Sequence, residues 1–213
     1  KEYPYVDVFV RGYAEEALVK YLDRRGDAEE SSIKGLFERH HDLGQQADAP
    51  LEYLSSPFLD GALPLQRFVR FETQRGCPFR CSFCQHRESE DQGVTSHLRR
   101  RRMFDKTRLE QEIELFSQGG VQDIAVLDPT FNSGPSYLSV LNSFAENHYC
   151  GKLSLQCRFE MVTPAFVDAV AAVNEAGGKV TLEFGLQTVV KREWDVIQRP
   201  NNLRKASLIM NQL

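Results

Sequence analysis

From residue 65 to the end of the chain, short apolar runs alternate with segments in which apolar residues recur at the spacing of a helix. Short runs of this kind are typical of strands that are covered on both faces. The expected strands span 65–73, 123–127, 153–159 and 179–184. The strand and helix order predicts an α/β fold with a parallel sheet.

The helices between these strands carry recognisable start and stop signals. We expect the first to begin at Asp105, a favoured N-cap residue, and to stop at a pair of glycines. Thr163 followed by Pro164 predicts the start of another helix. The remaining helices are expected at 136–147 and from Leu203 to the end of the sequence.

Composition narrows the class of protein. A chain of 213 residues with 41% hydrophobic and 26% charged residues suits one large globular domain, or one domain with part of another. No apolar run approaches the roughly 18 residues that span a bilayer, and the first residues do not form a signal peptide, so we expect a cytoplasmic protein without membrane contact. The net charge of -4 argues against a dedicated nucleic-acid binder, and we interpret the basic run 99–102 as a solvated segment.

The most informative pattern is a group of three cysteines, Cys77, Cys81 and Cys84, directly after the first expected strand. Their spacing is C-x3-C-x2-C, and no fourth cysteine is close in the sequence. Three thiolates on one loop can each bind one iron of a [4Fe-4S] cluster. This arrangement would leave the fourth iron open for a cofactor or substrate.

Zinc and disulfides are the alternative interpretations of the cysteines. Zinc could use the three thiolates and His86, but structural zinc ligands usually come from two separated pairs. Five cysteines is an odd number, and a chain with a sizeable core does not need disulfides. We therefore expect Cys150 and Cys157 to be buried free thiols.

The cysteine loop, with Phe83 directly before the third cysteine, resembles the signature of the radical S-adenosylmethionine (radical SAM) superfamily. The resemblance implies that the open iron binds S-adenosylmethionine, and that an electron from the cluster releases a 5'-deoxyadenosyl radical for hydrogen abstraction. It also implies a partial (β/α)6-type barrel with about four of the six strand and helix units. A reducing, flavodoxin- or ferredoxin-like electron donor and an adenine contact by Phe83 follow from the same resemblance.

Residues after the later strands are similar to other cofactor contacts of this family. Asp128 and Thr130 occupy the position of the segment that holds the amino group of the cofactor, although the family's glycine pair is absent. Glu160 is similar to the acidic residue presented to the cofactor, Gln187 to a ribose or sulfonium contact, and Arg199 to an arginine that pairs with the carboxylate. The alternatives are helix capping by the two carboxylates and an exposed turn position for Gln187.

The segment 1–64 carries a second resemblance. Its part from Tyr3 to Glu16 is similar to the last strand and turn of the cobalamin-binding, Rossmann-like domain that precedes many radical SAM cores. We predict a remnant of that domain in 1–27, a connector in 28–64 and the radical SAM core in 65–213. The chain looks truncated at both ends, and the cobalamin domain's Asp-x-His-x-x-Gly motif is absent, so we expect cobalamin only in a longer form of the protein.

The predicted function is a radical SAM enzyme. Methyl transfer through cobalamin is one option for the longer protein, and the sequence does not decide whether the product is methylated, cyclised or rearranged. Two alternatives are an iron-sulfur electron-transfer module without S-adenosylmethionine and a zinc-stabilised nucleic-acid-binding protein. The substrate is expected to be a small molecule or a peptide. The sequence does not identify it, because the family's substrate contacts come mostly from later strands.

Overall fold

The computed structural model describes residues 5–10, 12–23, 33, 36–38, 49–84, 86 and 102–212. The chain divides into two compact units. The small unit holds residues 1–54 and 90–94, and the larger one, here named the sheet unit, holds residues 55–89 and 95–213. The predicted boundaries after residues 27 and 64 stay predictions.

The small unit contains a two-stranded antiparallel sheet and one helix. Strand β1 (Val8–Val10) pairs with β2 (Leu36–Glu38), and helix α1 (Ala14–Asp23) follows β1. A short 3-10 helix spans Leu51–Tyr53. The buried residues of its small apolar cluster are Ala17, Ile33 and Leu36. A strand is thus present within the segment from Tyr3 to Glu16, as expected, and it is shorter than that segment.

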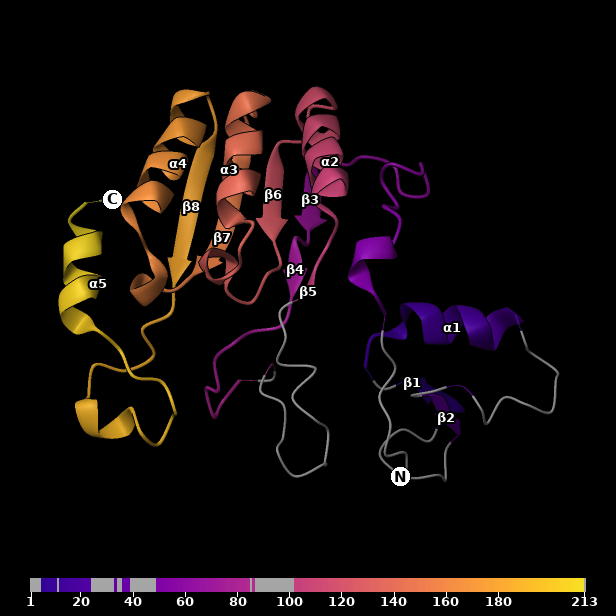
Figure 1. The fold of residues 1–213 in the computed structure, drawn as a ribbon, viewed down its shortest axis with the longest axis horizontal. Coiled ribbons are helices and arrows are strands. Elements are labelled where there is room, and N and C mark those ends of the chain that lie inside the picture. The colour runs from indigo at the N-terminus through magenta and orange to yellow at the C-terminus, as the bar shows by residue number, and fades with distance from the viewer. Residues whose placement is uncertain are drawn as a thin grey trace. The chain divides into compact units, whose positions relative to one another are not determined.

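A parallel four-stranded sheet forms the centre of the sheet unit, in the order β3-β6-β7-β8. The strands are β3 (Phe68–Phe71), β6 (Asp123–Val126), β7 (Lys152–Cys157) and β8 (Lys179–Phe184). Their arrows all point the same way in Figure 1, which brings their carboxyl ends to one edge. The predicted α/β fold with a parallel sheet is confirmed.

Three helices lie side by side on one face of this sheet (Figure 1). They are α2 (Lys106–Gln118), α3 (Tyr137–Glu146) and α4 (Pro164–Glu175), and α5 (Leu203–Met210) follows at the end of the chain. The predicted caps are present. Asp105 Oδ1 accepts a hydrogen bond from the backbone N–H of Arg108 at 3.0 Å, and Thr163 Oγ1 accepts one from that of Phe166 at 3.2 Å.

The core lies between the sheet and these helices. Apolar side chains of the strands are buried there, among them Val69, Phe71, Ile124, Val126, Leu153 and Leu155. Phe116 of α2 is fully buried, and its ring makes edge contacts with those of Phe58 and Phe71 at centroid distances of 5.1 and 5.3 Å. Burial of side chains of this size stabilises the fold by about 1.5–3 kcal/mol each.

The first strand of the sheet is shorter than the expected 65–73. Its parallel ladder has four positions, because its partner β6 has only four residues. The chain then forms β4 (Gln74–Arg75), which pairs antiparallel with β5 (Arg102–Met103). This small sheet was not predicted, since two-residue strands carry no detectable periodicity and the partners are distant in the sequence.

Short 3-10 helices follow three of the parallel strands. They span Phe131–Ser133, Phe159–Met161 and Lys191–Glu193. The third strand therefore ends at Cys157 rather than at residue 159. These turns replace extended backbone where each strand passes into the next helix or loop.

The two cysteines outside the cluster motif have different environments. Cys157 is buried at the end of β7, as expected. The expectation for Cys150 is wrong, because this residue is exposed in the loop between α3 and β7. Its Sγ donates a hydrogen bond to the backbone carbonyl of His148 at 3.1 Å. A residue in a surface connection has no neighbouring layer to cover its side chain.

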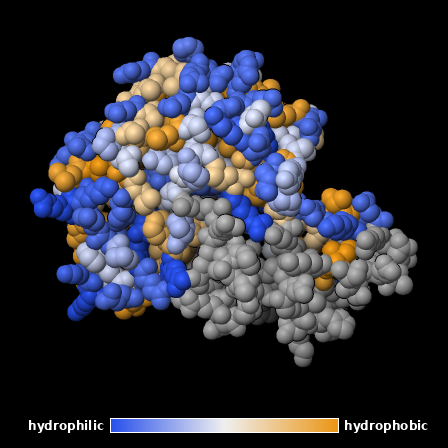
Figure 2. Space-filling model, in the orientation of Figure 1, coloured by the Kyte–Doolittle hydropathy of each residue, from blue (hydrophilic) through white to orange (hydrophobic). Residues whose placement is uncertain are grey.

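No helix in the described part of the chain is long and apolar enough to cross a membrane. Figure 2 shows hydrophilic side chains over much of the visible face, interrupted by small hydrophobic patches. Scattered patches of this kind are normal for folded proteins.

Candidate functional site

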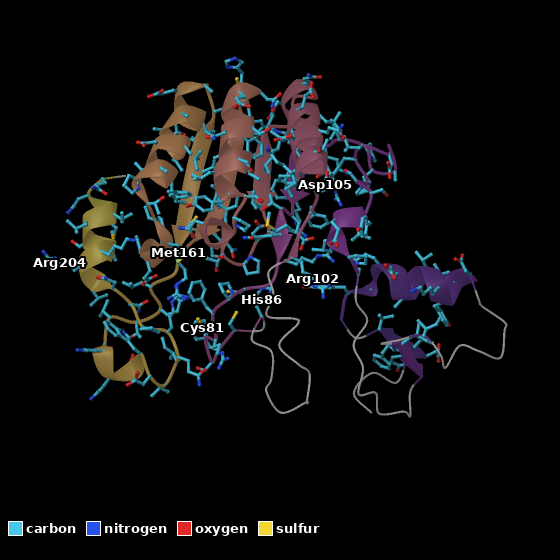
Figure 3. The ribbon with its side chains drawn as sticks, in the orientation of Figure 1. Cys81, His86, Arg102, Asp105, Met161 and Arg204 are labelled. Carbon is cyan, nitrogen blue, oxygen red and sulfur yellow. The ribbon has the colours of Figure 1, made fainter. Side chains whose placement is uncertain are left out.

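A cavity of about 420 Å³ opens at the carboxyl ends of the parallel strands. Its walls come from the cysteine loop, the residues after β6, the ends of β7 and β8, and the segment that holds Arg199. Figure 3 shows Cys81 and His86 below the lower ends of the strands. Ligands of parallel α/β sheets bind at this edge.

The cysteine loop is fastened by backbone and hydroxyl hydrogen bonds. Gly76 enters it with a φ of 91°, a conformation that suits glycine because it has no Cβ. The N–H of Cys84 donates to the carbonyl of Cys81 at 3.0 Å. The N–H and Oγ of Ser82 donate to the carbonyls of Ile197 and Val196 at 2.9 and 3.0 Å. The loop is thus tied to a segment that comes much later in the chain.

All three cysteine side chains line the cavity. Cys77 and Cys84 are half-buried and Cys81 is buried. The Sγ of Cys77 lies 3.5 Å from the hydroxyl oxygen of Thr130, and the Sγ of Cys81 accepts a hydrogen bond from Nη1 of Arg199 at 3.6 Å. The three thiols of one fixed loop therefore face a common cavity, and the positively charged side chain of Arg199 lines the same cavity.

This donor set fits a [4Fe-4S] cluster. Within the described ranges, no three His, Cys, Asp or Glu side chains are grouped closely enough to hold one metal ion. One zinc ion needs its thiolates to converge on a single point at about 2.3 Å. In a cubane cluster each thiolate binds a different iron, so the three sulfur atoms stand farther apart.

Arg199 is 8% exposed and lies in the cavity wall. Its Nη2 donates to the carbonyl of Gly185, and its Nη1 donates to Cys81. Its Nε is buried and has no hydrogen-bond partner among the residues that the structure describes. A buried donor without a partner costs about 1–3 kcal/mol, so an anionic group bound in the cavity would relieve this cost. The geometry is compatible with the predicted carboxylate contact, which stays a prediction.

Gln187 reaches the cavity from the turn after β8. Its φ of 60° lies in the left-handed region, which is unfavourable for residues other than glycine unless the surroundings enforce it. Asn201 provides such enforcement, because its Nδ2 donates to the carbonyls of Leu186 and Thr188 at 2.8 and 2.9 Å. The turn therefore fixes the backbone of Gln187 at the cavity, while its side chain is exposed. This position agrees with the alternative of an exposed turn residue, and the cofactor contact of Gln187 stays a prediction.

The other predicted contacts divide into two groups. Phe83 and Thr130 line the cavity, and Phe83 is half-exposed there. Asp128 and Glu160 are not among the lining residues. The structure therefore gathers seven of the nine predicted site residues, the three cysteines included, around one space.

Asp128 is fully buried and connects two strand ends. Its Oδ1 accepts hydrogen bonds from the N–H groups of Thr73 and Gln74 at 2.9 and 3.2 Å, and its Oδ2 accepts one from the Thr73 hydroxyl. Burial raises the pKa of Asp128 to about 6, although these hydrogen bonds act in the opposite direction. The side chain thus fixes the chain between β3 and β4, which leads into the cysteine loop.

Glu160 does not line the cavity and is held by Arg158 and Asn202. Its carboxylate accepts hydrogen bonds from Nε of Arg158 and from the N–H of Asn202, both at 3.2 Å. Burial alone raises the pKa of Glu160, but backbone N–H groups and Arg158 outweigh that effect and hold the pKa below its ordinary value. The side chain is therefore a fixed anion that anchors the start of α5 near the end of β7. Its predicted cofactor contact stays a prediction.

Arg158 is a site residue that the sequence analysis did not select. Its guanidinium lies 3.8 Å from the ring centroid of Phe79, which belongs to the cysteine loop. Asn132 exchanges two hydrogen bonds of 2.9 Å with the backbone of Arg158. Arg158 therefore supports the loop through this stacking contact. The sequence placed Arg158 inside the expected strand 153–159, and no local pattern signals its contact with Phe79, which lies far earlier in the chain.

Cys157 is a further thiol in the cavity wall. Burial raises its pKa to about 12, the main cause being desolvation of the thiolate. A thiol with this pKa stays protonated at neutral pH, and only a thiolate is a good metal ligand. Cys157 is therefore a poor candidate for an iron ligand, although it lies in the cavity wall.

Comparisons of the sequence identify a family. Residues 71–208 match the model of the Radical SAM superfamily. The chain is 33% identical over 162 residues to 2-(S-pantetheinyl)-carbapenam-3-carboxylate methyltransferase of Streptantibioticus cattleyicolor. It is 32% identical over 164 residues to the cobalamin-dependent radical SAM methyltransferase TokK of Streptomyces tokunonensis. Each alignment covers 68% of this chain, and the chain spans about a quarter, 23%, of each relative.

Solved structures share the fold. The radical S-adenosylmethionine methyltransferase TsrM from Kitasatospora setae, with tryptophan and a SAM analogue bound, matches with a TM-score of 0.70 at 16% identity. The match covers 96% of this chain and 43% of TsrM. A TsrM structure with cobalamin and a [4Fe-4S] cluster matches with a TM-score of 0.69 at 17% identity, and the match covers 44% of that chain. The family model covers more than half of the sequence, including the cysteine loop, and the chain therefore belongs to the radical SAM superfamily.

Proposed function

We propose that this chain forms the part of a cobalamin-dependent radical SAM methyltransferase that binds the [4Fe-4S] cluster and S-adenosylmethionine. One observation carries the proposal: the three thiols of a single loop line one cavity at the carboxyl ends of the sheet, together with Arg199 and Gln187. Family membership supports the two cofactors. Methyl transfer is supported by the names of both relatives, and cobalamin by the name of one of them.

Different residues of the cavity would bind different parts of the two cofactors. Cys77, Cys81 and Cys84 would hold the cluster, and Nε of Arg199 is available to a carboxylate of the bound cofactor. Phe83 would contact the adenine, and Gln187 the ribose or sulfonium side. When bound, the two cofactors supply one-electron chemistry that the side chains themselves cannot perform. The protein's part is to orient the reactants and to exclude water.

The remaining roles in the cavity would be those of supports. Thr130 lies beside Cys77 and would fix the wall where the amino group of the cofactor binds. Asp128 and Glu160 would act from outside the cavity, through the hydrogen bonds that hold the neighbouring turns. An indirect role of this kind fits both carboxylates better than direct contact, because their acceptor oxygens already have protein partners.

We also propose the partners of the reaction. A small-molecule substrate is supported by the name of the carbapenam methyltransferase and by the tryptophan in the TsrM structure. A peptide is the second candidate. A flavodoxin- or ferredoxin-like protein would deliver the electron that reduces the cluster. The reducing cytoplasm would keep the three cysteines free to bind iron, because disulfides rarely persist there. No role is proposed for a membrane or a nucleic acid.

Electron paramagnetic resonance tests the proposal directly. The protein is reconstituted with iron and sulfide without oxygen, reduced with dithionite, and measured with and without S-adenosylmethionine. We expect one [4Fe-4S] cluster per chain and a change in its signal when S-adenosylmethionine binds to the open iron. Cys81→Ala should abolish the signal, because it removes one of three iron ligands.

Cys150→Ala is the matched control, since it removes an exposed thiol outside the cavity. This variant should bind the cluster as the wild type does. A cluster that ignores S-adenosylmethionine would favour the electron-transfer alternative. Retained zinc without sulfide would favour the zinc-stabilised alternative and would refute the proposed function. The comparisons favour neither alternative.

A further inference from the structure

The guanidinium of Arg199 lies against the thiol of Cys81. Both residues are more than nine-tenths buried, and Nη1 of Arg199 donates to the Sγ of Cys81 at 3.6 Å. Sulfur accepts hydrogen bonds at longer distances than oxygen because its atomic radius is larger. Arginine carries its positive charge at every relevant pH. Once Cys81 is a thiolate, this contact becomes a hydrogen bond between opposite charges.

Neither partner can easily move away from this contact. Nη2 of Arg199 donates to the carbonyl of Gly185, and its backbone N–H donates to the carbonyl of Trp194 at 2.9 Å. The cysteine loop is held on the same segment by the two hydrogen bonds from Ser82. The contact therefore joins two parts of the chain that are already fixed next to each other.

The charge of Arg199 is not neutralised by an ion pair with any described carboxylate. The polar contacts of its side chain are the sulfur of Cys81 and the carbonyl oxygen of Gly185, and its Nε has no partner among the described residues. Arg158, the other cation in the cavity wall, pairs with Glu160 at 3.2 Å and stacks on Phe79. Arg199 is therefore the stronger source of positive potential at the sulfur of Cys81. Burial limits screening of this potential by water and salt.

The potential of an iron-sulfur cluster depends on the net charge, on hydrogen bonds to its sulfur atoms and on solvent exposure. A cluster that gains an electron becomes more negative, and a nearby cation stabilises that form more than the oxidised form. We infer that Arg199 is a positioning residue that raises the reduction potential of the cluster through its hydrogen bond to Cys81. This inference rests on the proposed function, because it requires the cluster.

A redox titration of the reconstituted protein tests this role. The cluster accepts one electron from dithionite, and no bond forms or breaks. Omitting S-adenosylmethionine removes any effect of a carboxylate contact by Arg199. We expect Arg199→Gln to lower the ratio of reduced to oxidised cluster about tenfold at the midpoint potential of the wild type. For a one-electron couple, this change equals a shift of about 59 mV towards more negative values.

Two further variants separate charge from structure. Arg199→Lys keeps the positive charge but lacks the forked pair of donors, so its shift should be smaller and of the same sign. Arg192→Gln removes an exposed charge from the same segment and should leave the potential unchanged. Iron and sulfide content is measured for every variant, so that only samples with intact clusters are compared.

The outcomes distinguish this inference from the proposed function. A wild-type protein without a cluster would count against the function itself. An intact cluster whose potential is the same in wild type and Arg199→Gln would overturn only the role of Arg199. If Arg199→Gln does not retain the cluster, Arg199→Lys decides, and an unshifted potential in that variant overturns the inference.

Discussion

The parallel sheet has two kinds of buried residue. Those in the middle of the strands, here named the body, are apolar, and several of those at the carboxyl ends, here named the rim, are polar. In the body, Ile124 and Leu153 are 1% and 0% exposed and have only apolar side chains. At the rim, Asp128 and Arg158 are 0% and 5% exposed and are polar. Apolar burial is not directional, whereas hydrogen bonds fix specific atoms. The body therefore determines that the chain folds, and the rim determines where the cysteine loop and the cavity lie.

Phe116→Ala in α2 would break the body and should have the largest effect. It removes a fully buried ring that contacts Phe58 and Phe71, so the free energy of unfolding should fall by about 3–5 kcal/mol. Urea denaturation of the apoprotein measures this change. The folded fraction should still bind one cluster, because the rim contacts remain. A folded variant without a cluster would show that the two regions are not separable.

Asp128→Asn tests the rim through the pH dependence of the free energy of unfolding. The pKa of Asp128 is about 6 in the folded protein, against 3.8 for the free group, and the folded state therefore binds the proton more tightly. The stability that this group contributes is present below about pH 4 and is lost as the pH rises through 6. The free energy of unfolding of the wild type, relative to that of the variant, should fall by about 3 kcal/mol over this range.

Asn keeps the side-chain size and one acceptor oxygen for the N–H groups of Thr73 and Gln74, so it is a conservative control for packing. Urea unfolding of both proteins at several pH values provides the comparison. Parallel curves for the two proteins between pH 4 and 7 would contradict the prediction. They would mean that Asp128 does not titrate in this range.

Helix α2 carries one buried and one exposed ion pair, and a comparison of the two has the smallest expected effect on stability. Arg108 and Glu112 form an ion pair at 3.3 Å with side chains 15% and 1% exposed, and Lys106 and Glu110 form one at 3.3 Å with side chains 69% and 48% exposed. Arg108→Met should lower the free energy of unfolding by about 1–3 kcal/mol, since Glu112 loses a charged donor. Lys106→Met should change it by less than about 0.5 kcal/mol. Equal effects in thermal or urea unfolding would show that burial does not distinguish the pairs.

Sequence patterns were reliable where one local rule dominates. The caps at Asp105 and Thr163, the helix at 136–147 and strand β8 all lie where the pattern placed them. The cysteine loop was found because its spacing alone carries chemical meaning. Patterns were less reliable where tertiary contacts decide, as for the exposure of Cys150 and the small sheet of β4 and β5.

The roles of polar side chains at the rim depend on partners that are remote in the sequence. Asp128 and Thr73 lie 55 positions apart, and Arg199 and Cys81 lie 118 positions apart. Sequence reasoning could place Asp128 and Glu160 after strands, but not decide whether their carboxylates face the cavity. In the structure, both carboxylates are held by hydrogen bonds to neighbouring turns.

The sequence by itself determined the family, the α/β order and the three candidate iron ligands, because these depend on spacing and periodicity along the chain. Only the tertiary structure decided that Arg199 contacts Cys81, that Arg158 supports Phe79, and that Asp128 ties strand ends together. Hydrogen bonds and stacking act over a few ångströms in space. Which residues come within that reach is set by the packing of the whole sheet unit.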